Sequence, residues 1–180
     1  MTSSKIFDNT LCTLGEGPMW HPKRESLIWF DIMGMCMYER GLYHKKPNKF
    51  QFNHFVSACG WVNDTQILIA TSKSLDTFDL ECSSVKTLVD LEAENSRTRP
   101  NDGRTDPLGG FWISTMGIEH ESEAGSIYRF YKGELRKLFS KISIPNSICF
   151  SPDGATGYFC DSGSHIIMAV KLDSNGWPVS

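Results

Sequence analysis

Residues 99–116 read RPNDGRTDPLGGFWISTM and pass from a polar segment through a glycine-containing turn into an apolar strand. Arg99, Asn101 and Asp102 stand directly before Gly103. Three polar side chains beside a glycine combine close backbone approach with concentrated hydrogen-bonding capacity. Asn-Asp-Gly is also ordinary turn chemistry, so the stretch alone supports either interpretation. The recurrence of the pattern along the chain favours a functional role.

Short segments rich in β-forming residues fill the chain, and their pattern starts four times. The anchors of the four units are Gly17, Gly60, Gly103 and Ser147, about 43 residues apart. A period of roughly 40–50 residues with four short strands per unit is typical of a β-propeller. No helical periodicity of useful length is present. We predict a single all-β domain over 1–180, a propeller of four-stranded blades, with a β-sandwich as the alternative.

The strand assignments follow the same repeat. Ile6, Phe7, Leu11 and Leu14 are expected to form an edge strand before the first unit. The predicted strands of the four units are 14–22, 26–32, 35–40 and 49–52; 59–62, 66–71, 75–80 and 86–89; 102–103, 111–114, 125–130 and 134–138; and 146–150, 157–161 and 165–170.

Composition excludes several classes of protein. The formal charge is −3, and the densest basic spot is Lys45-Lys46, which argues against a nucleic-acid groove. No apolar run approaches the roughly 18 residues that a membrane span requires, and residues 1–8 lack the apolar region of a signal peptide. The six cysteines are widely spaced and form no C-x-x-C pair, so we predict buried thiols of a cytoplasmic protein.

The repeat also places polar residues together. The first strand of each propeller blade lines the channel, so the residues just before those strands meet at one mouth. They are Glu16, Cys59, Asn101 with Asp102, and Asn146. Carboxylate and amide oxygens are the ligands that Ca²⁺ and Mg²⁺ prefer, which predicts a hard-cation site from which Cys59 faces away or merely packs. The alternative is that Glu16 and Asn146 only cap turns.

Three groups of segments carry a family resemblance. They are LGEGPMW (14–20) with LIWFDI (27–32), RPNDGRTDP (99–107) with FWISTM (111–116), and IPNS (144–147) with SPDG (151–154) and YFCDS (158–162). In this order they resemble the SMP-30/gluconolactonase/regucalcin family. The resemblance implies a six-bladed propeller that holds one divalent cation in its channel and commonly hydrolyses sugar lactones. About four of six blades would then be present.

The resemblance also implies residue roles. Glu16 and Asn146 correspond to metal ligands, and Arg99 and Asn101 to residues that contact the sugar lactone. Glu119 lies where some members place a further substrate contact. The cation would be Ca²⁺ first, with Zn²⁺, Mn²⁺ or Mg²⁺ as alternatives.

Three departures from the family pattern stand out. Pro100 replaces a frequent aromatic residue, and Ser147 replaces a usual glycine, which points to an altered backbone beside the metal. The chain also ends at Val179-Ser180, within the expected last strand of the fourth blade. The family's catalytic aspartate, in the fifth blade, would then lie beyond residue 180. The chain is accordingly expected to be truncated, to lack a catalytic residue, and to associate with itself through open blade faces.

The predicted function is metal-dependent hydrolysis of a sugar lactone. The cation would polarise the ring carbonyl, Arg99 would steady the oxyanion and Asn101 would orient the sugar. Two alternatives remain. One is a non-catalytic calcium-binding or interaction propeller, and the other is an esterase or organophosphate hydrolase on the same scaffold.

Overall fold

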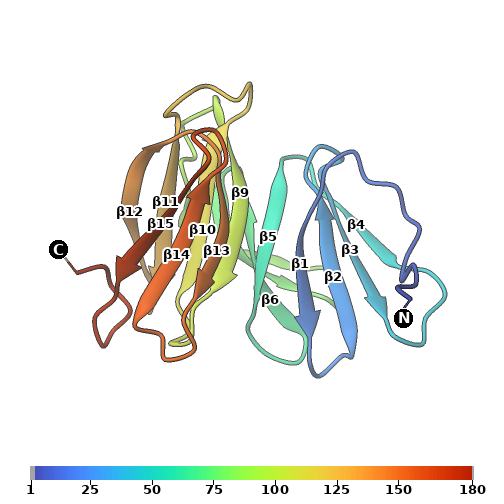
Figure 1. Ribbon diagram of the computed structural model, residues 1–180. Helices are drawn as coiled ribbons and strands as arrows, with labels where there is room; N and C mark the ends of the chain where they lie inside the picture. The colour runs from blue at the N-terminus through green and yellow to red at the C-terminus, as the bar shows by residue number, and fades with distance from the viewer. Residues whose placement is uncertain (1–2, 180) are drawn as a thin grey trace.

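Four antiparallel sheets make up the computed structural model, which describes residues 3–179 (Figure 1). The first sheet contains β1 (Gly15–His21), β2 (Ser26–Asp31), β3 (Cys36–Gly41) and β4 (Asn48–Gln51). The second contains β5 (Val56–Trp61), β6 (Gln66–Thr71), β7 (Ser74–Asp79) and β8 (Val85–Asp90). The third contains β9 (Thr98–Thr105), β10 (Phe111–Gly117), β11 (Gly125–Tyr131) and β12 (Glu134–Ile142). The fourth contains β13 (Pro145–Phe150), β14 (Thr156–Asp161) and β15 (Ile166–Lys171).

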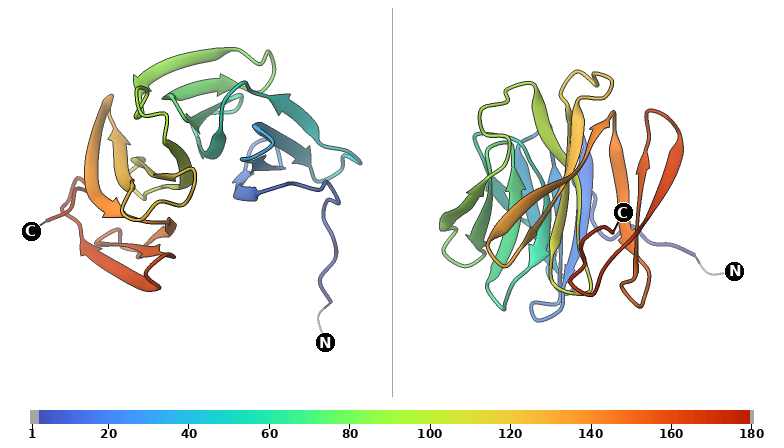
Figure 2. Two further views of the ribbon diagram at one scale, coloured as in Figure 1. Left: turned by 90° about the horizontal axis from the view of Figure 1, so that it is seen from above. Right: turned by 90° about the vertical axis from the view of Figure 1, so that its left-hand side faces the viewer.

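The sheets are successive blades of a propeller. Consecutive strands pair within each sheet, so every sheet is a meander. Seen from above, the sheets form an arc that is open on one side (Figure 2). The inner strands follow one another around the channel, because β1 contacts β5, β5 contacts β9 and β9 contacts β13. The propeller prediction is confirmed, and the β-sandwich alternative is wrong.

The N-terminal segment does not form the predicted edge strand. Residues 3–14 contain no strand, and the Thr10 amide instead donates to Asp8 Oδ1 at 2.8 Å in a local turn. Asx turns of this kind interrupt an extended backbone. Arg40 on β3 holds the segment through an ion pair with Asp8 at 2.8 Å and a stacking contact with Phe7. Side-chain contacts therefore replace a backbone ladder.

Among residues 3–179, the fourth sheet has the three strands assigned from the sequence but not the last strand in which the chain was expected to end. The chain after β15 turns back on itself. Asp173 Oδ1 accepts hydrogen bonds from the amides of Asn175 and Trp177, both at 2.8 Å, and Leu172 forms an isolated bridge with Pro178. The Asx turn diverts the chain before a further ladder begins.

The hydrophobic core lies between the blades. One cluster joins the first and second sheets, a second joins the second and third, and a third joins the third and fourth. Residues 67–70 of β6 are all apolar because both faces of this strand are buried. Ile67 and Ile69 enter the first cluster, whereas Leu68 and Ala70, which point to the opposite face, enter the second. A strand buried on both faces needs apolar residues at odd and even positions alike.

The inner strands carry bulges that change the predicted register. The pairing shifts between Glu16 and Met19 in β1 and between Asn146 and Cys149 in β13, so Gly17 and Ser147 lie inside bulges. Gly103 pairs with Ile113 and Gly60 with Leu68, so the four sequence anchors are not equivalent positions. A one-residue insertion in a strand is invisible to a count of spacings.

Gly17 and Ser147 share a left-handed backbone. Their φ values are 58° and 59°. At Gly17 a Cβ atom would lie 2.3 Å from the Ser57 carbonyl oxygen, so glycine is required there. Ser147 adopts the same conformation at the equivalent bulge. The serine therefore has the left-handed φ that Gly17 has. An altered backbone beside the metal, relative to the glycine usual in the family, stays a prediction.

The cysteines are all free thiols, as predicted. Cys36 and Cys59 are buried, as predicted. The prediction of buried thiols fails for the other four, since Cys12 and Cys160 are half-buried and Cys82 and Cys149 are exposed. Cys82 lies in the β7–β8 turn, and Cys149 lies on β13, whose side chains are partly open to solvent. Apolar character alone does not show which face of a strand a cysteine occupies.

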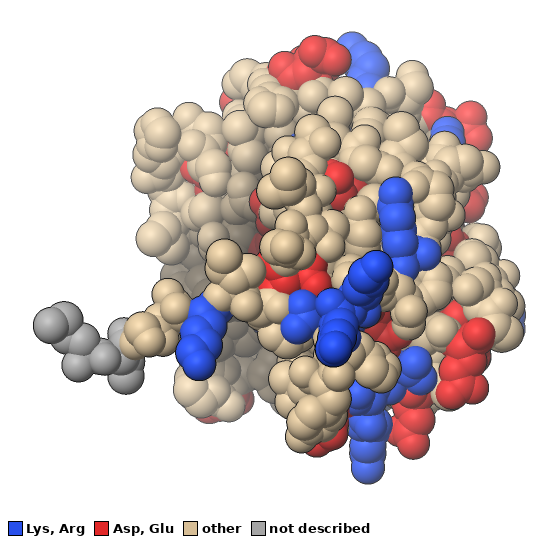
Figure 3. Space-filling view, turned by 90° about the vertical axis from the view of Figure 1, so that its right-hand side faces the viewer, with Lys and Arg blue, Asp and Glu red and all other residues tan. Residues whose placement is uncertain are grey.

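Charges are mixed on the face formed by the first sheet. Lys and Arg side chains lie there among Asp and Glu side chains (Figure 3). This surface offers no uninterrupted basic groove for a phosphate backbone. Among the described residues, no helix is long and apolar enough to cross a membrane.

Candidate functional site

Residues from three inner strands line one cavity of about 560 Å³ in the channel. Glu16 comes from β1, Asp102 from β9 and Asn146 from β13. The remaining lining residues are Arg104, Ser147, Ile148, Cys149 and Ser162. The fold thus brings the two predicted metal ligands, Glu16 and Asn146, to the same cavity although they belong to the first and fourth sheets.

Two carboxylates share this cavity. Burial raises the pKa of Glu16, and the negative charge of Asp102 raises it further, while the Arg99 charge acts in the opposite direction. Burial also raises the pKa of Asp102, despite the Ile148 amide that donates to its Oδ2 at 2.7 Å. Both groups are therefore easier to protonate than usual. A cation between them would remove that repulsion.

A chain of hydrogen bonds crosses from β9 to the end of β14. Arg99 Nη1 donates to Asn101 Oδ1 at 2.9 Å. Asn101 Nδ2 donates to Asn146 Oδ1 and to the Pro145 carbonyl, both at 3.0 Å. Asn146 Nδ2 donates to Ser162 Oγ at 3.2 Å. The predicted substrate pair is thereby tied directly to a predicted metal ligand.

Arg99 and Asn101 are less accessible than their predicted roles suggest. They were expected in a polar loop before a strand, but both lie within β9 and are only 4% and 5% exposed. Neither belongs to the residues that line the cavity. Arg99 Nη1 and both polar atoms of the Asn101 amide form hydrogen bonds within the protein. The contact of these two residues with a substrate stays a prediction.

Glu119 lies apart from this network. It is exposed in the loop after β10, and its backbone amide donates to Glu121 Oε2 at 3.1 Å. Met116 pairs with Arg99, so this loop leaves the sheet at the end where Arg99 lies. That placement is compatible with a substrate contact, which stays a prediction.

Cys59 packs, as one of its two predicted arrangements required. It is buried on β5, and its Sγ lies 3.8 Å from Met19 Sδ. Burial raises the pKa of the thiol, so the thiolate that a soft metal would need is disfavoured.

The cavity fits a hard divalent cation. Its donors are the Glu16 and Asp102 carboxylates and the Asn146 amide oxygen. Among residues 3–179 there is no cluster of three or more His, Cys, Asp or Glu suited to a metal. A cation held here would therefore combine carboxylate, amide and water oxygens, as Ca²⁺ and Mg²⁺ do.

Comparison with known proteins places the chain. Residues 14–180 match the model of the SMP-30/Gluconolactonase/LRE-like region. The chain belongs to the SMP-30/gluconolactonase family. It is similar to a putative sugar lactone lactonase of Rhizobium meliloti, with 37% identity over 95% of this chain and 58% of that protein. It is also similar to an L-arabinolactonase of Azospirillum brasilense, with 32% identity over 87% of this chain and 54% of that protein.

Solved structures of the family share the architecture. The structure of a calcium-binding protein, regucalcin, from Agrobacterium tumefaciens matches with a TM-score of 0.96 and 39% identity, over 99% of this chain and 61% of that chain. The chain thus spans about three fifths of the length of the relatives it matches.

Not every aspartate in the family motifs belongs to the cavity. Asp106 accepts from the amides of Leu108 and Gly110, from the Trp112 indole and from Arg129 Nε, the last at 2.6 Å. Asp106 therefore anchors a turn. Asp161 likewise accepts from the amides of Ser143, Ile144 and Gly163.

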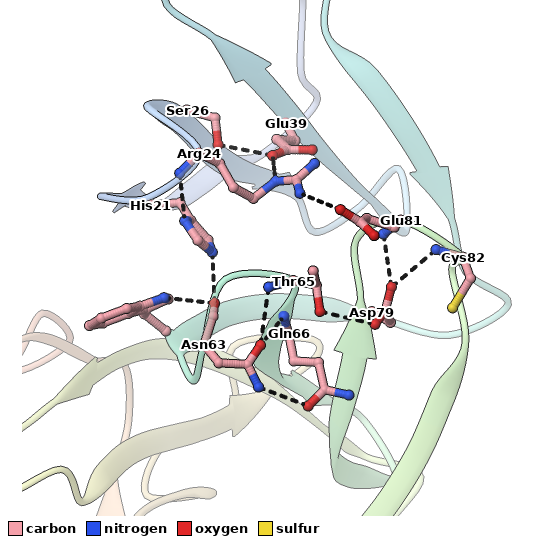
Figure 4. Close-up of polar contacts among 11 residues, drawn as sticks. His21, Arg24, Ser26, Glu39, Asn63, Thr65, Gln66, Asp79, Glu81 and Cys82 are labelled. Atoms are coloured by element: carbon pink, nitrogen blue, oxygen red, sulfur yellow. Dashed lines mark hydrogen bonds and ion pairs between the residues drawn. The ribbon is translucent and has the colours of Figure 1, made fainter.

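A second polar cluster joins the first and second sheets (Figure 4). The Arg24 amide donates to His21 Nδ1, so the ring proton is on Nε2, which donates to the Asn63 carbonyl at 3.1 Å. Arg24 Nε and Ser26 Oγ both donate to Glu39 Oε1, at 2.7 and 2.9 Å. Burial lowers the pKa of His21 and keeps the ring neutral. The cluster ties two blades together.

Sequence reasoning missed four of the residues that line the cavity, namely Arg104, Ile148, Cys149 and Ser162. Ser162 follows β14 and accepts the Asn146 amide. The only available signal was the motif YFCDS, which places a hydroxyl directly after the structural Asp161. Asp102 was placed at the channel mouth but assigned no role, and the structure puts it in the cavity wall.

Proposed function

We propose that the chain binds a divalent cation, Ca²⁺ first, through Glu16 and Asn146, as part of a site that hydrolyses sugar lactones. The observation that carries the proposal is the meeting of these two residues and Asp102 in one cavity. The similarity to proteins named as sugar lactone lactonases supports the substrate class. The similarity to a protein named as a calcium-binding regucalcin supports the cation.

The residues divide the work as follows. When bound, a divalent cation supplies Lewis-acid polarisation of a lactone carbonyl. Glu16 contributes charge and Asn146 a neutral oxygen to the cation site. Arg104, which lines the same cavity, would bring a positive charge to an oxyanion that develops there. Arg99, Asn101 and Glu119 remain the proposed contacts for the sugar. We assign no general base among residues 3–179.

Calcium titration calorimetry and lactone hydrolysis test the proposal. We expect Glu16→Gln to weaken Ca²⁺ binding by about tenfold or more, because a charged ligand becomes neutral. Glu134→Gln is the matched control, since Glu134 is an exposed carboxylate paired with Arg136 on β12. Equal Ca²⁺ affinity in both variants would contradict the cation site.

A non-catalytic calcium-binding propeller is the second candidate, favoured by the family likeness to regucalcin. Release of acid from gluconolactone, with Ca²⁺, Zn²⁺ or Mn²⁺ added, separates the two. Turnover that Glu16→Gln abolishes supports the lactonase. Tight Ca²⁺ binding without turnover under any of these metals supports the binding protein. Self-association and a cytoplasmic location stay predictions.

A further inference from the structure

The hydrogen-bond chain from Arg99 to Ser162 has a fixed direction. A guanidinium group only donates hydrogen bonds, whereas a side-chain amide has one donating and one accepting end. Arg99 Nη1 contacts the Asn101 side chain at 2.9 Å, so the atom facing it must be the oxygen. The NH₂ group of Asn101 therefore points away from Arg99. Reversing this amide would set two donors against each other.

The orientation of the Asn101 amide fixes that of the Asn146 amide. Asn101 Nδ2 has two hydrogens, and it donates one to the Pro145 carbonyl and one to Asn146 Oδ1. The Asn146 side chain consequently presents its oxygen to β9 and its NH₂ group to Ser162 Oγ. A carbonyl oxygen has two lone pairs, so one of them remains for a cation.

Burial makes this arrangement hard to change. Arg99 and Asn101 are almost completely enclosed, and a buried donor left without a hydrogen-bond partner destabilises the protein. Without the constraint, the Asn146 amide could rotate and turn its NH₂ group, a poor neighbour for a cation, into the cavity. Arg99, together with the Pro145 carbonyl that accepts from the Asn101 NH₂ group, sets the direction that prevents this rotation.

We propose that Arg99 is a positioning residue, which acts through Asn101 to orient the Asn146 carbonyl oxygen for the cation, and that Ser162 holds the other end of the Asn146 amide. The proposal rests on the proposed cation site at Asn146. It gives Arg99 a role that does not require contact with a substrate.

The decisive variant is Asn101→Asp. An aspartate still accepts from Arg99 but cannot donate to Asn146, so the Asn146 amide is free to turn its NH₂ group toward it. The variant also adds a negative charge near the cavity, which by itself would tighten cation binding. We expect Ca²⁺ affinity, measured by calorimetry, to fall by about tenfold, the usual effect of losing a residue that orients a metal ligand. Unchanged or tighter binding, in a variant with wild-type circular dichroism, overturns the proposal.

The two ends of the chain give matched pairs. Arg99→Met should weaken Ca²⁺ binding, and Arg99→Lys, which keeps a donor, should restore part of it. Ser162→Ala should weaken binding less than Asn101→Asp does, and Ser162→Thr should restore it. If the conservative and disruptive variants of a pair bind Ca²⁺ equally, the position does not orient the ligand.

A metal-free measurement separates this proposal from the proposed function. In nuclear magnetic resonance spectra without added metal, the side-chain amide protons of Asn101 and Asn146 should exchange slowly, and those of Asn146 should change in Asn101→Asp. Fast exchange of both in the wild type overturns the hydrogen-bond chain. Slow exchange with no Ca²⁺ binding by the wild type retains the chain but rejects the cation site.

Discussion

The second and fourth sheets have similar strands but different surroundings. In the second sheet, the side chains on both faces of β6 pack into hydrophobic clusters. In the fourth, Phe159 of β14 enters a cluster, whereas the neighbouring Tyr158 is partly exposed, and β15 is exposed over most of its length. A blade therefore gains its stability from its neighbours, since the apolar clusters lie between the sheets.

The β9 and β13 walls of the candidate site also differ in how neighbouring sheets cover them. The β9 wall is fixed by sheets on both sides, and its Arg99 and Asn101 are buried. The β13 wall belongs to the fourth sheet and carries the half-buried Asn146. Ser114 Oγ donates to the Pro145 carbonyl and Asp102 accepts the Ile148 amide, which holds β13 against β9. The position of Asn146 thus depends on contacts from the third sheet.

The largest expected difference is in stability. Trp112, 1% exposed, packs between the third and fourth sheets, so we expect Trp112→Ala to lower the free energy of unfolding by about 3–5 kcal/mol. Ile167 on β15 is 77% exposed, and Ile167→Ala should change it by less than about 0.5 kcal/mol. Urea denaturation measures both. Similar losses would show that β15 is covered in solution.

Asp31 in the first sheet and Asp161 in the fourth form the same kind of hydrogen bonds, and we expect a smaller difference in stability between their variants. Each accepts hydrogen bonds from three backbone amides, at Thr13, Leu14 and Gly34 for the former and at Ser143, Ile144 and Gly163 for the latter. Replacement by alanine leaves these donors unpaired and should lower the free energy of unfolding by about 1–3 kcal/mol. Asp31→Ala should have the larger effect, because Asp31 is buried and Asp161 is half-buried. The reverse order in urea denaturation would contradict the comparison.

These two carboxylates also predict the response to acid. Burial alone would raise the pKa of each, but the backbone amides hold both below their usual value. Such groups stabilise the fold above the unfolded-state pKa of about 4, and that stability is lost as the pH falls through the lower folded-state pKa. The free energy of unfolding should therefore decline below about pH 4, and less steeply in Asp161→Ala. An equal slope in the variant would remove Asp161 from this account.

The strands were predictable because the residues that favour strands and those that favour turns indicated the same boundaries. Apolar runs such as residues 66–71 and turn residues such as Pro152-Asp153-Gly154 marked where strands begin and end. The convergence of Glu16 and Asn146 followed from the repeat, since inner strands of successive blades surround one channel. Long-range placement was therefore accessible wherever the period was regular.

Bulges and side-chain direction were not predictable in this way. Bulges at Gly17 in β1, at Ser147 in β13 and between Pro100 and Gly103 in β9 shift the register without changing the spacing of the motifs. One residue of shift decides which side of a strand faces the channel, so the burial of Arg99 and Asn101 could not be read from the motif. Ser162 was missed because its partner Asn146 lies on the neighbouring strand, and a single sequence does not record that contact.

The smallest expected effect concerns the backbone at Ser147. A non-glycine residue with φ of 59° is strained, so Ser147→Gly should raise the free energy of unfolding by about 0.5–1 kcal/mol. Ser140, exposed on β12 and without a positive φ, is the matched control, and Ser140→Gly should lower it by a similar amount. Urea denaturation of the two variants measures both changes.

Ser147→Gly should leave Ca²⁺ affinity unchanged, because the bulge already has the left-handed φ of Gly17. A loss of affinity would mean that the serine side chain itself supports the site.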